Sequence, residues 1–185
     1  MKELEGMETR PTTDRVKEGL FNVLQFDIEG RRVLDLFAGT GQLGIECLSR
    51  GAAEAVFAER RPDALKLIRE NLKVTELSDR ARVVAGDSLE FLSTTKEKYD
   101  IILLDPPYAS GLLEEALKLI AKRDLLNPHG IVTAECPAEH VLPELPAPYR
   151  MGRIFADILG KVNQQLAAQA DEAYFMACGF PIRLK

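Results

Sequence analysis

Short apolar runs alternate with helix-like stretches along this chain, and this alternation restricts its fold more than any other feature. Strands are predicted at 33–37, 55–58, 81–85, 99–104 and 131–135, and helices at 43–50, 63–74, 89–93 and 112–122. Parallel strands need crossover connections, and helices of about 10 residues supply them. The pattern therefore predicts an α/β fold with a doubly wound, mostly parallel sheet and helices on both faces.

The two ends of the chain are less regular. The spacing of apolar residues within 10–30 predicts an opening helix, so residues 1–30 are taken as a helical N-terminal segment. The segments 153–159 and 173–180 are compatible either with two strands or with one strand and a tail. Two strands would bring the sheet to about seven strands. The role of residues 160–185 stays open. With 185 residues and no long linker, the chain is expected to form a single domain over 1–185.

Composition excludes several classes of protein. No apolar run approaches the roughly 18 residues of a membrane helix, and the first residues, MKELEGMETR, do not form a secretory signal. The three cysteines, an odd number without CxxC spacing, suggest neither a disulfide framework nor a metal site. His129, in a turn after Asn127-Pro128, and His140 are interpreted as surface residues, and Cys47 as a core residue. A reduced, cytoplasmic protein without metal is expected.

A glycine-rich motif, GxGxxG, follows the first predicted strand and opens a helix at residues 39–44. Glu59 comes about 20 residues later, where an acid can bind ribose hydroxyls. An NAD-dependent oxidoreductase would explain both features. Asp35, inside the first strand, favours S-adenosylmethionine instead, because its carboxylate repels a pyrophosphate and attracts amino and sulfonium groups. The alternative role of Asp35 is to accept hydrogen bonds from loop amides.

Two further acids follow strand ends. Asp87, with Ser88 after it, is placed to bind the exocyclic amine of an adenine, to cap the next helix, or both. Asp105 begins a DPPY element after the strand 99–104, where its carboxylate and the Pro106 carbonyl form rigid acceptors for an exocyclic amine. Tyr108 offers a face on which a flipped-out base can stack. A rigid turn with an aromatic plug is the alternative interpretation of DPPY.

The chain resembles the bacterial 16S ribosomal RNA guanine-N2 methyltransferases, within the Rossmann-like class I S-adenosylmethionine-dependent enzymes. The resemblance rests on RPTTDRVKEGLFN at 10–22, VLDLFAGTGQLGIECLSRGA at 33–52 and LLDPPY at 103–108, and it spans about residues 7–158. It implies that Asp105, Pro106 and Tyr108 are catalytic. It also implies a set of cofactor contacts, namely Thr13, Arg15, Asp35, Phe37, Gly39, Gly41, Glu59, Asp87 and Ser88.

The net charge of -5 bears on the partner. An acidic protein neutralises few phosphates over a broad face, so weak binding to free nucleic acid is expected. A basic segment usual in the family before the position of Met7 is represented here only by MKELEG. The expected substrate is therefore 16S rRNA within a 30S particle or an assembly intermediate, bound by a monomer.

Several alternatives stay open at this point. A DNA adenine-N6 methyltransferase shares DPPY but usually needs an added target-recognition region, for which 185 residues leave little room. A protein-glutamine methyltransferase would more typically carry Asn in place of Asp105. An NAD-dependent oxidoreductase leaves DPPY without a role, and a non-catalytic RNA-binding module is a further alternative.

Overall fold

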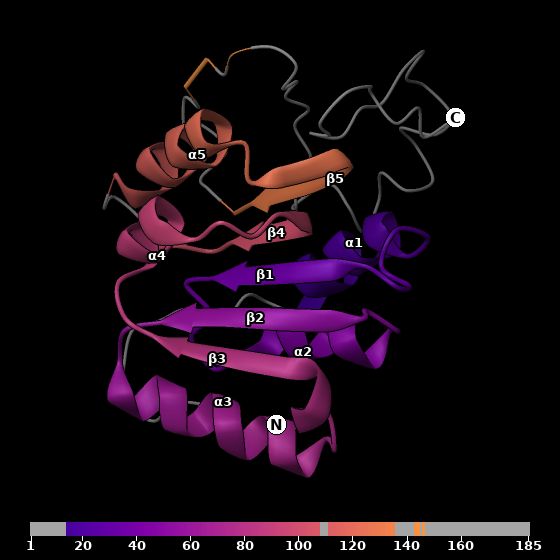
Figure 1. Cartoon of the computed structure of the whole chain (residues 1–185). Helices are drawn as coiled ribbons and strands as arrows, with labels where there is room; N and C mark the ends of the chain where they lie inside the picture. The colour runs from indigo at the N-terminus through magenta and orange to yellow at the C-terminus, as the bar shows by residue number, and fades with distance from the viewer. Residues whose placement is uncertain (1–13, 108–110, 136–142, 145, 147–185) are drawn as a thin grey trace.

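A computed structural model describes residues 14–107, 111–135, 143, 144 and 146. Their strands form one five-stranded sheet in the order β3-β2-β1-β4-β5, and every neighbouring pair is parallel (Figure 1). The strands are β1 (Arg32–Leu36), β2 (Glu54–Glu59), β3 (Ala81–Ala85), β4 (Tyr99–Leu104) and β5 (Leu126–Ala134). The order reverses between β1 and β4, which is the doubly wound arrangement that the alternation predicts.

Helices cover both faces of the sheet (Figure 1). They are α1 (Asp14–Leu24), α2 (Gln42–Ser49), α3 (Pro62–Val74), α4 (Ser88–Thr94) and α5 (Leu112–Arg123), with a 3-10 turn, η1 (Ser78–Arg80), before β3. The first three helices share one buried cluster with alternate strand residues, and α4 and α5 share the other. Successive side chains of a strand point to opposite faces, and the three central strands, β2, β1 and β4, are buried on both sides.

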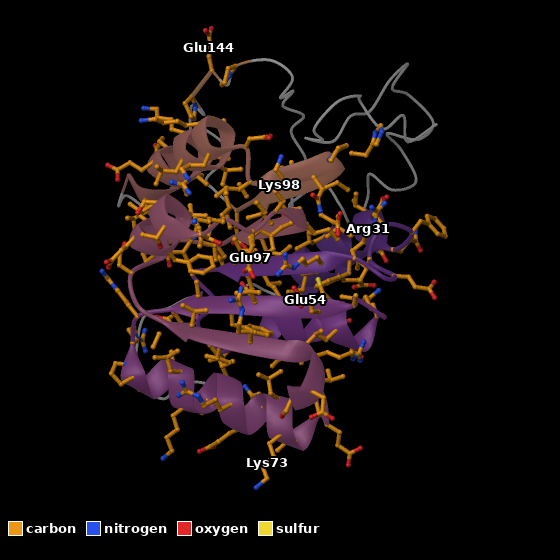
Figure 2. All side chains as sticks on the ribbon, viewed as in Figure 1. Arg31, Glu54, Lys73, Glu97, Lys98 and Glu144 are labelled. Atoms are coloured by element: carbon orange, nitrogen blue, oxygen red, sulfur yellow. The ribbon has the colours of Figure 1, made fainter. Side chains whose placement is uncertain are left out.

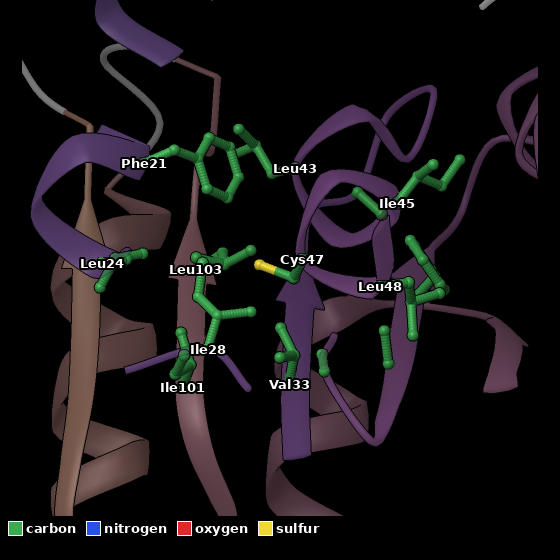
Figure 3. Close-up of a cluster of buried hydrophobic side chains, with 14 of the residues drawn as sticks. Phe21, Leu24, Ile28, Val33, Leu43, Ile45, Cys47, Leu48, Ile101 and Leu103 are labelled. Carbon is green, nitrogen blue, oxygen red and sulfur yellow. The ribbon is translucent and has the colours of Figure 1, made fainter. Parts of the chain in front are cut away.

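Figure 3 shows part of the cluster beneath α1 and α2. Phe21 and Leu24 of α1 pack with Leu43 of α2 and with Leu103 of β4, all of them buried. Cys47 lies fully buried among them, and burial raises the pKa of its thiol. The interpretation of Cys47 as a core residue is confirmed.

Charged side chains pair near the starts of the strands, and Figure 2 labels two of them, Glu54 and Glu97. Arg32 pairs with Glu54 and with Glu97, and Glu97 also accepts hydrogen bonds from Arg82 and from the Tyr99 hydroxyl. Burial would raise the pKa of Glu97, but these hydrogen bonds outweigh it and lower the pKa. This network ties β1, β2, β3 and β4 together at their starts.

The fifth strand begins earlier than the sequence predicts. Leu126 already pairs with Tyr99, and β5 then runs from Leu126 to Ile131 while β4 advances only from Tyr99 to Ile101. The extra residues form a bulge in which His129 has φ 62°. Asn-Pro-His-Gly was predicted as a turn, and this was wrong because a bulge uses the same residues within a strand. The side chain of His129 is exposed, as predicted.

The opening helix is shorter than predicted. Helix α1 ends at Leu24, and the chain then turns through hydrogen bonds from Asp27 N to Leu24 O and from Arg31 N to Ile28 O. Ile28 is buried beyond the helix end, so the core extends past the last turn of α1. Residues 10–13 and the segments 153–159 and 173–180 lie outside the described residues. No helix of the described part is long and apolar enough to cross a membrane.

Candidate active site

Three carboxylates lie at the carboxyl ends of three adjacent strands, β2, β1 and β4. Leu36 of β1 pairs with Ala58 on one side and with Leu104 on the other, so the next residues, Glu59 and Asp105, flank the end of β1. Asp35 is one residue before Leu36 in the same strand. The sheet therefore brings together the acids that the sequence predicts, at the edge where ligands bind in doubly wound sheets.

The glycine loop connects β1 to α2 with a backbone that suits glycine. Gly39 and Gly41 have φ 55° and 79°, in the left-handed region. Among the described residues, a Cβ at Gly39 would have only the Phe37 carbonyl oxygen near it, at 4.0 Å, so that part of the chain leaves the loop open there. Phe37 itself has φ 68°, a conformation that is uncommon outside glycine. A ligand can thus approach the loop backbone closely at Gly39.

Asp35 is almost fully buried, with 2% of its surface exposed. Its Oδ2 accepts a hydrogen bond of 2.9 Å from Gly44 N, so Asp35 accepts from a backbone amide as the alternative role requires, but that amide lies in the first turn of α2 and not in the loop before it. Burial raises the pKa of Asp35 to about 8, and the charges of Asp105 and Glu59 add to the rise, against the Gly44 hydrogen bond. A cation beside these carboxylates would be stabilised, which keeps the predicted contact with an amino or sulfonium group compatible with the structure.

Replacing Asp35 by Asn is expected to flatten the dependence of stability on pH. The folded state holds a proton on Asp35 up to about pH 8, whereas in the unfolded chain the carboxyl ionises near 3.8. The free energy of unfolding therefore falls as pH rises between these values, by roughly 2–5 kcal/mol from this group. Urea denaturation at pH 5 and pH 8 measures it: Asp35→Asn should gain on wild type at pH 8 relative to pH 5. Parallel pH profiles would contradict this account of Asp35.

Glu59 organises the loops on either side of it. Its Oε2 accepts from Gly39 N at 2.8 Å, and its Oε1 accepts from Arg60 N and Arg61 N, both at 2.9 Å. A buried carboxylate with three backbone donors is well satisfied. These bonds fix the glycine loop against the end of β2. The predicted contact with ribose hydroxyls stays a prediction, since each carboxylate oxygen can accept more than one hydrogen bond.

Asp87 caps α4, which confirms one of its two predicted roles. Its Oδ1 accepts from Leu89 N at 2.9 Å and from Glu90 N at 3.0 Å. The side chain of Asp87 is exposed, while Ser88 is buried with 6% of its surface exposed. The contacts of Asp87 and Ser88 with an adenine stay predictions.

The DPPY element follows β4 directly. Asp105 is half-buried, Pro106 is buried and Pro107 is exposed. Tyr108 lies outside the described residues, so its stacking role stays a prediction. The structure thus places the Asp105 carboxyl beside the end of β1, where the glycine loop begins.

The remaining predicted cofactor contacts are less fully described. Arg15 lies in α1, whereas Thr13 lies outside the described residues. Phe37 is partly buried and packs against the cluster beneath α4 and α5. The contacts of these three residues with a cofactor stay predictions.

The comparisons with known proteins decide the family. The family model described as Conserved hypothetical protein 95 matches residues 1–162. The chain belongs to this family. Ribosomal RNA small subunit methyltransferase D of Escherichia coli strain K12 is 39% identical over 157 residues, 85% of this chain and 78% of the relative. The protein of the same name from Haemophilus influenzae is 38% identical over 129 residues, 68% and 67% of the two chains.

Solved structures agree with the family and the fold. The Escherichia coli protein yhhF, which bears the name of a methyltransferase, has a TM-score of 0.74 and 37% identity, with 83% of each chain covered. A hypothetical protein of Thermus thermophilus has a TM-score of 0.67 and 30% identity, with 84% of this chain and 88% of that chain covered. The fold of this family member is therefore the Rossmann-like fold of methyltransferases, as the sequence predicts.

Two residues that bond to the glycine loop or to the start of α2 in this family member were not predicted. Asn71 of α3 donates from Nδ2 to the Thr40 carbonyl oxygen at 3.1 Å, and Lys17 of α1 donates from Nζ to Gln42 Oε1 at 2.9 Å. Asn71 interrupts the apolar face of α3, and a polar residue in such a stripe is the signal that could have identified it. Among the described residues, no group of three or more His, Cys, Asp or Glu is placed to hold a metal ion.

Proposed function

We propose that this chain transfers a methyl group from S-adenosylmethionine to the exocyclic N2 amine of a guanine in 16S ribosomal RNA. One observation supports this most strongly: Asp105, the predicted acceptor for the amine, lies at the end of β4 beside the end of β1, from which the glycine loop starts. An acceptor for a base and a loop for a nucleoside cofactor are thus neighbours at one edge of the sheet.

The residues present fit S-adenosylmethionine as the cofactor. Asp35 lies close to the negative charges of Glu59 and Asp105, and a ligand with positively charged ammonium and sulfonium groups bound there favours the ionised form of Asp35. The same charges disfavour the pyrophosphate of NAD. The open side of Gly39 allows close approach of the ligand to the backbone. When bound, S-adenosylmethionine supplies an electrophilic methyl group.

The protein's part in the reaction is to position the amine. The Asp105 carboxylate and the Pro106 carbonyl accept hydrogen bonds from the two N–H groups of the guanine amine and direct its nitrogen lone pair toward the methyl group. Tyr108 stacks on the base and holds it out of its helix. Transfer to this nitrogen would form the N–C bond as the methyl–sulfur bond of the bound cofactor breaks, and the amine would release one proton to solvent. Alignment of this kind lowers the barrier without a histidine base.

The relatives guide the choice of substrate. Two of the relatives compared with this chain bear the name ribosomal RNA small subunit methyltransferase D. The acidic chain, with a net charge of -5, is suited to a structured partner more than to free nucleic acid. We therefore expect a monomer that acts in the cytoplasm on a 30S particle or an assembly intermediate.

A comparison of three nucleic-acid substrates tests whether ribosomal RNA is the methyl acceptor. The protein is incubated with methyl-labelled S-adenosylmethionine and 30S particles lacking the modification, naked 16S rRNA or duplex DNA at equal nucleotide concentration. Label is expected in the RNA of the 30S particle, at a rate about tenfold or more above that for naked RNA. Label in duplex DNA alone would favour an adenine-N6 methyltransferase and would contradict the proposal.

A further inference from the structure

Asn71 is a buried polar residue in α3, the helix that packs beside the glycine loop. Only 1% of its surface is exposed, and it lies next to Leu72 on the buried side of the helix. Its Nδ2 donates to the carbonyl oxygen of Thr40, 31 positions earlier in the chain. A buried amide is costly unless it is hydrogen-bonded, so this bond joins the helix to the loop at a defined point.

This bond fixes one peptide unit of the glycine loop from both sides. The unit between Thr40 and Gly41 receives the Asn71 hydrogen bond at its oxygen, and its N–H donates to the Ala38 carbonyl oxygen at 2.7 Å. With both polar groups engaged, the unit cannot rotate without breaking a hydrogen bond. Gly41 keeps φ 79° in this arrangement.

Neighbouring contacts hold α3 at the right distance for this bond. Ile68, one turn before Asn71, is fully buried, and a Cβ added at Gly41 would lie 3.3 Å from its Cγ1. On the other side, Gly39 N is held by Glu59. The backbone carbonyl of Asn71 accepts from Thr75, a helix-end bond that any residue at position 71 could keep. The side-chain amide of Asn71 therefore supplies a hydrogen bond from α3 to the loop, beside the packing of Ile68.

We infer that Asn71 is a positioning residue for the cofactor loop: it orients the Thr40–Gly41 peptide so that the ligand-free loop already has its binding conformation. This inference rests on the proposed cofactor. A preorganised loop loses less conformational freedom on binding, so loss of the Asn71 hydrogen bond weakens affinity and raises the KM for S-adenosylmethionine. The DPPY element, which is proposed to bind the amine, follows a different strand, β4. Loss of the Asn71 hydrogen bond is therefore expected to change kcat at saturating cofactor little.

The test uses Asn71→Leu, which keeps the approximate volume and removes the donor, and Asn71→Ala, in case leucine does not fit. Leu72→Ala is the matched control, because Leu72 is buried in the same helix without a bond to the loop. Binding of S-adenosylhomocysteine is measured by calorimetry at a temperature where all variants are folded. Both Asn71 variants are expected to bind about fivefold to thirtyfold more weakly, and Leu72→Ala within about twofold of wild type.

Hydrogen exchange of the Gly41 amide gives a second readout that needs no ligand. Exchange at Gly41 is expected to be faster in the Asn71 variants than in Leu72→Ala at matched global stability. Unchanged affinity and unchanged Gly41 exchange in a folded Asn71 variant would overturn the inference. If wild type does not bind S-adenosylhomocysteine, the proposed cofactor fails instead, and the exchange result still decides whether Asn71 fixes the loop.

Discussion

Asp105→Ala is expected to slow methyl transfer by roughly 10²- to 10⁴-fold while affinity for S-adenosylmethionine stays within about threefold of wild type. The carboxyl lies at the end of β4, half-buried, beside the strand that leads into the glycine loop. Its removal takes away an acceptor for the amine but leaves the hydrogen bonds that Glu59, Asp35 and Asn71 make with the loop and the start of α2. Single-turnover transfer to 30S particles and calorimetry with S-adenosylhomocysteine measure the two quantities separately.

Asp79→Ala serves as the control for this variant. Asp79 is an exposed acid in η1, which precedes β3 and therefore lies at the opposite end of the sheet. The substitution removes the same charge and should leave both quantities unchanged. Near-normal turnover of Asp105→Ala would show that the amine is held elsewhere. A loss of cofactor affinity equal to the loss of rate would place Asp105 in the cofactor site alone.

Gly44→Ala is expected to destabilise the fold by about 1–3 kcal/mol and to weaken cofactor binding. A Cβ at this position would lie 2.4 Å from Cε1 of Phe57 and 3.0 Å from Oδ2 of Asp35. Phe57 is fully buried in β2, so its ring has little room to move. Helix α2 would have to shift away from the sheet, and this shift would lengthen or break the hydrogen bond that Gly44 N donates to Asp35 Oδ2. Urea denaturation measures the change in the free energy of unfolding.

A second substitution, at Phe57, separates the crowding of the new methyl group against the Phe57 ring from the effect of alanine on the helix itself. Phe57→Leu removes the ring atoms that the new methyl group would meet. The double variant Gly44→Ala with Phe57→Leu should therefore be more stable than the sum of the two single effects predicts, by about 1 kcal/mol. Strictly additive effects would mean that the close contact with Phe57 does not limit residue 44.

Local sequence patterns predicted the sheet and the site edge well. The strands at 81–85 and 99–104 have the predicted bounds, and Asp35, Glu59 and Asp105 meet at one edge as their positions at or near the carboxyl ends of buried strands imply. Strand periodicity and strand ends depend on local sequence, so they can be predicted from a single sequence. The start of β5 was missed because Asn-Pro-His-Gly is typical of both turns and bulges, and only the pairing of Leu126 with Tyr99 separates the two.

The partners of the site residues could not be predicted in the same way. Glu59 was identified by its spacing from the glycine motif, but its bonds to Gly39, Arg60 and Arg61 depend on how two loops meet. Asn71 was missed because its partner is a backbone carbonyl far away in the sequence. The raised pKa of Asp35 likewise results from its burial in the folded chain. Neither the composition nor the motif shows how deeply the side chain is buried.

The most direct test of the central claim is the identity of the methylated atom. RNA from 30S particles incubated with the protein and S-adenosylmethionine is digested to nucleosides and separated by mass spectrometry, with Asp105→Ala in parallel. The account predicts N2-methylguanosine with the wild-type chain and a loss of that product with Asp105→Ala. A methyl group on another atom, such as adenine N6, or N2-methylguanosine that forms equally with Asp105→Ala, would contradict it.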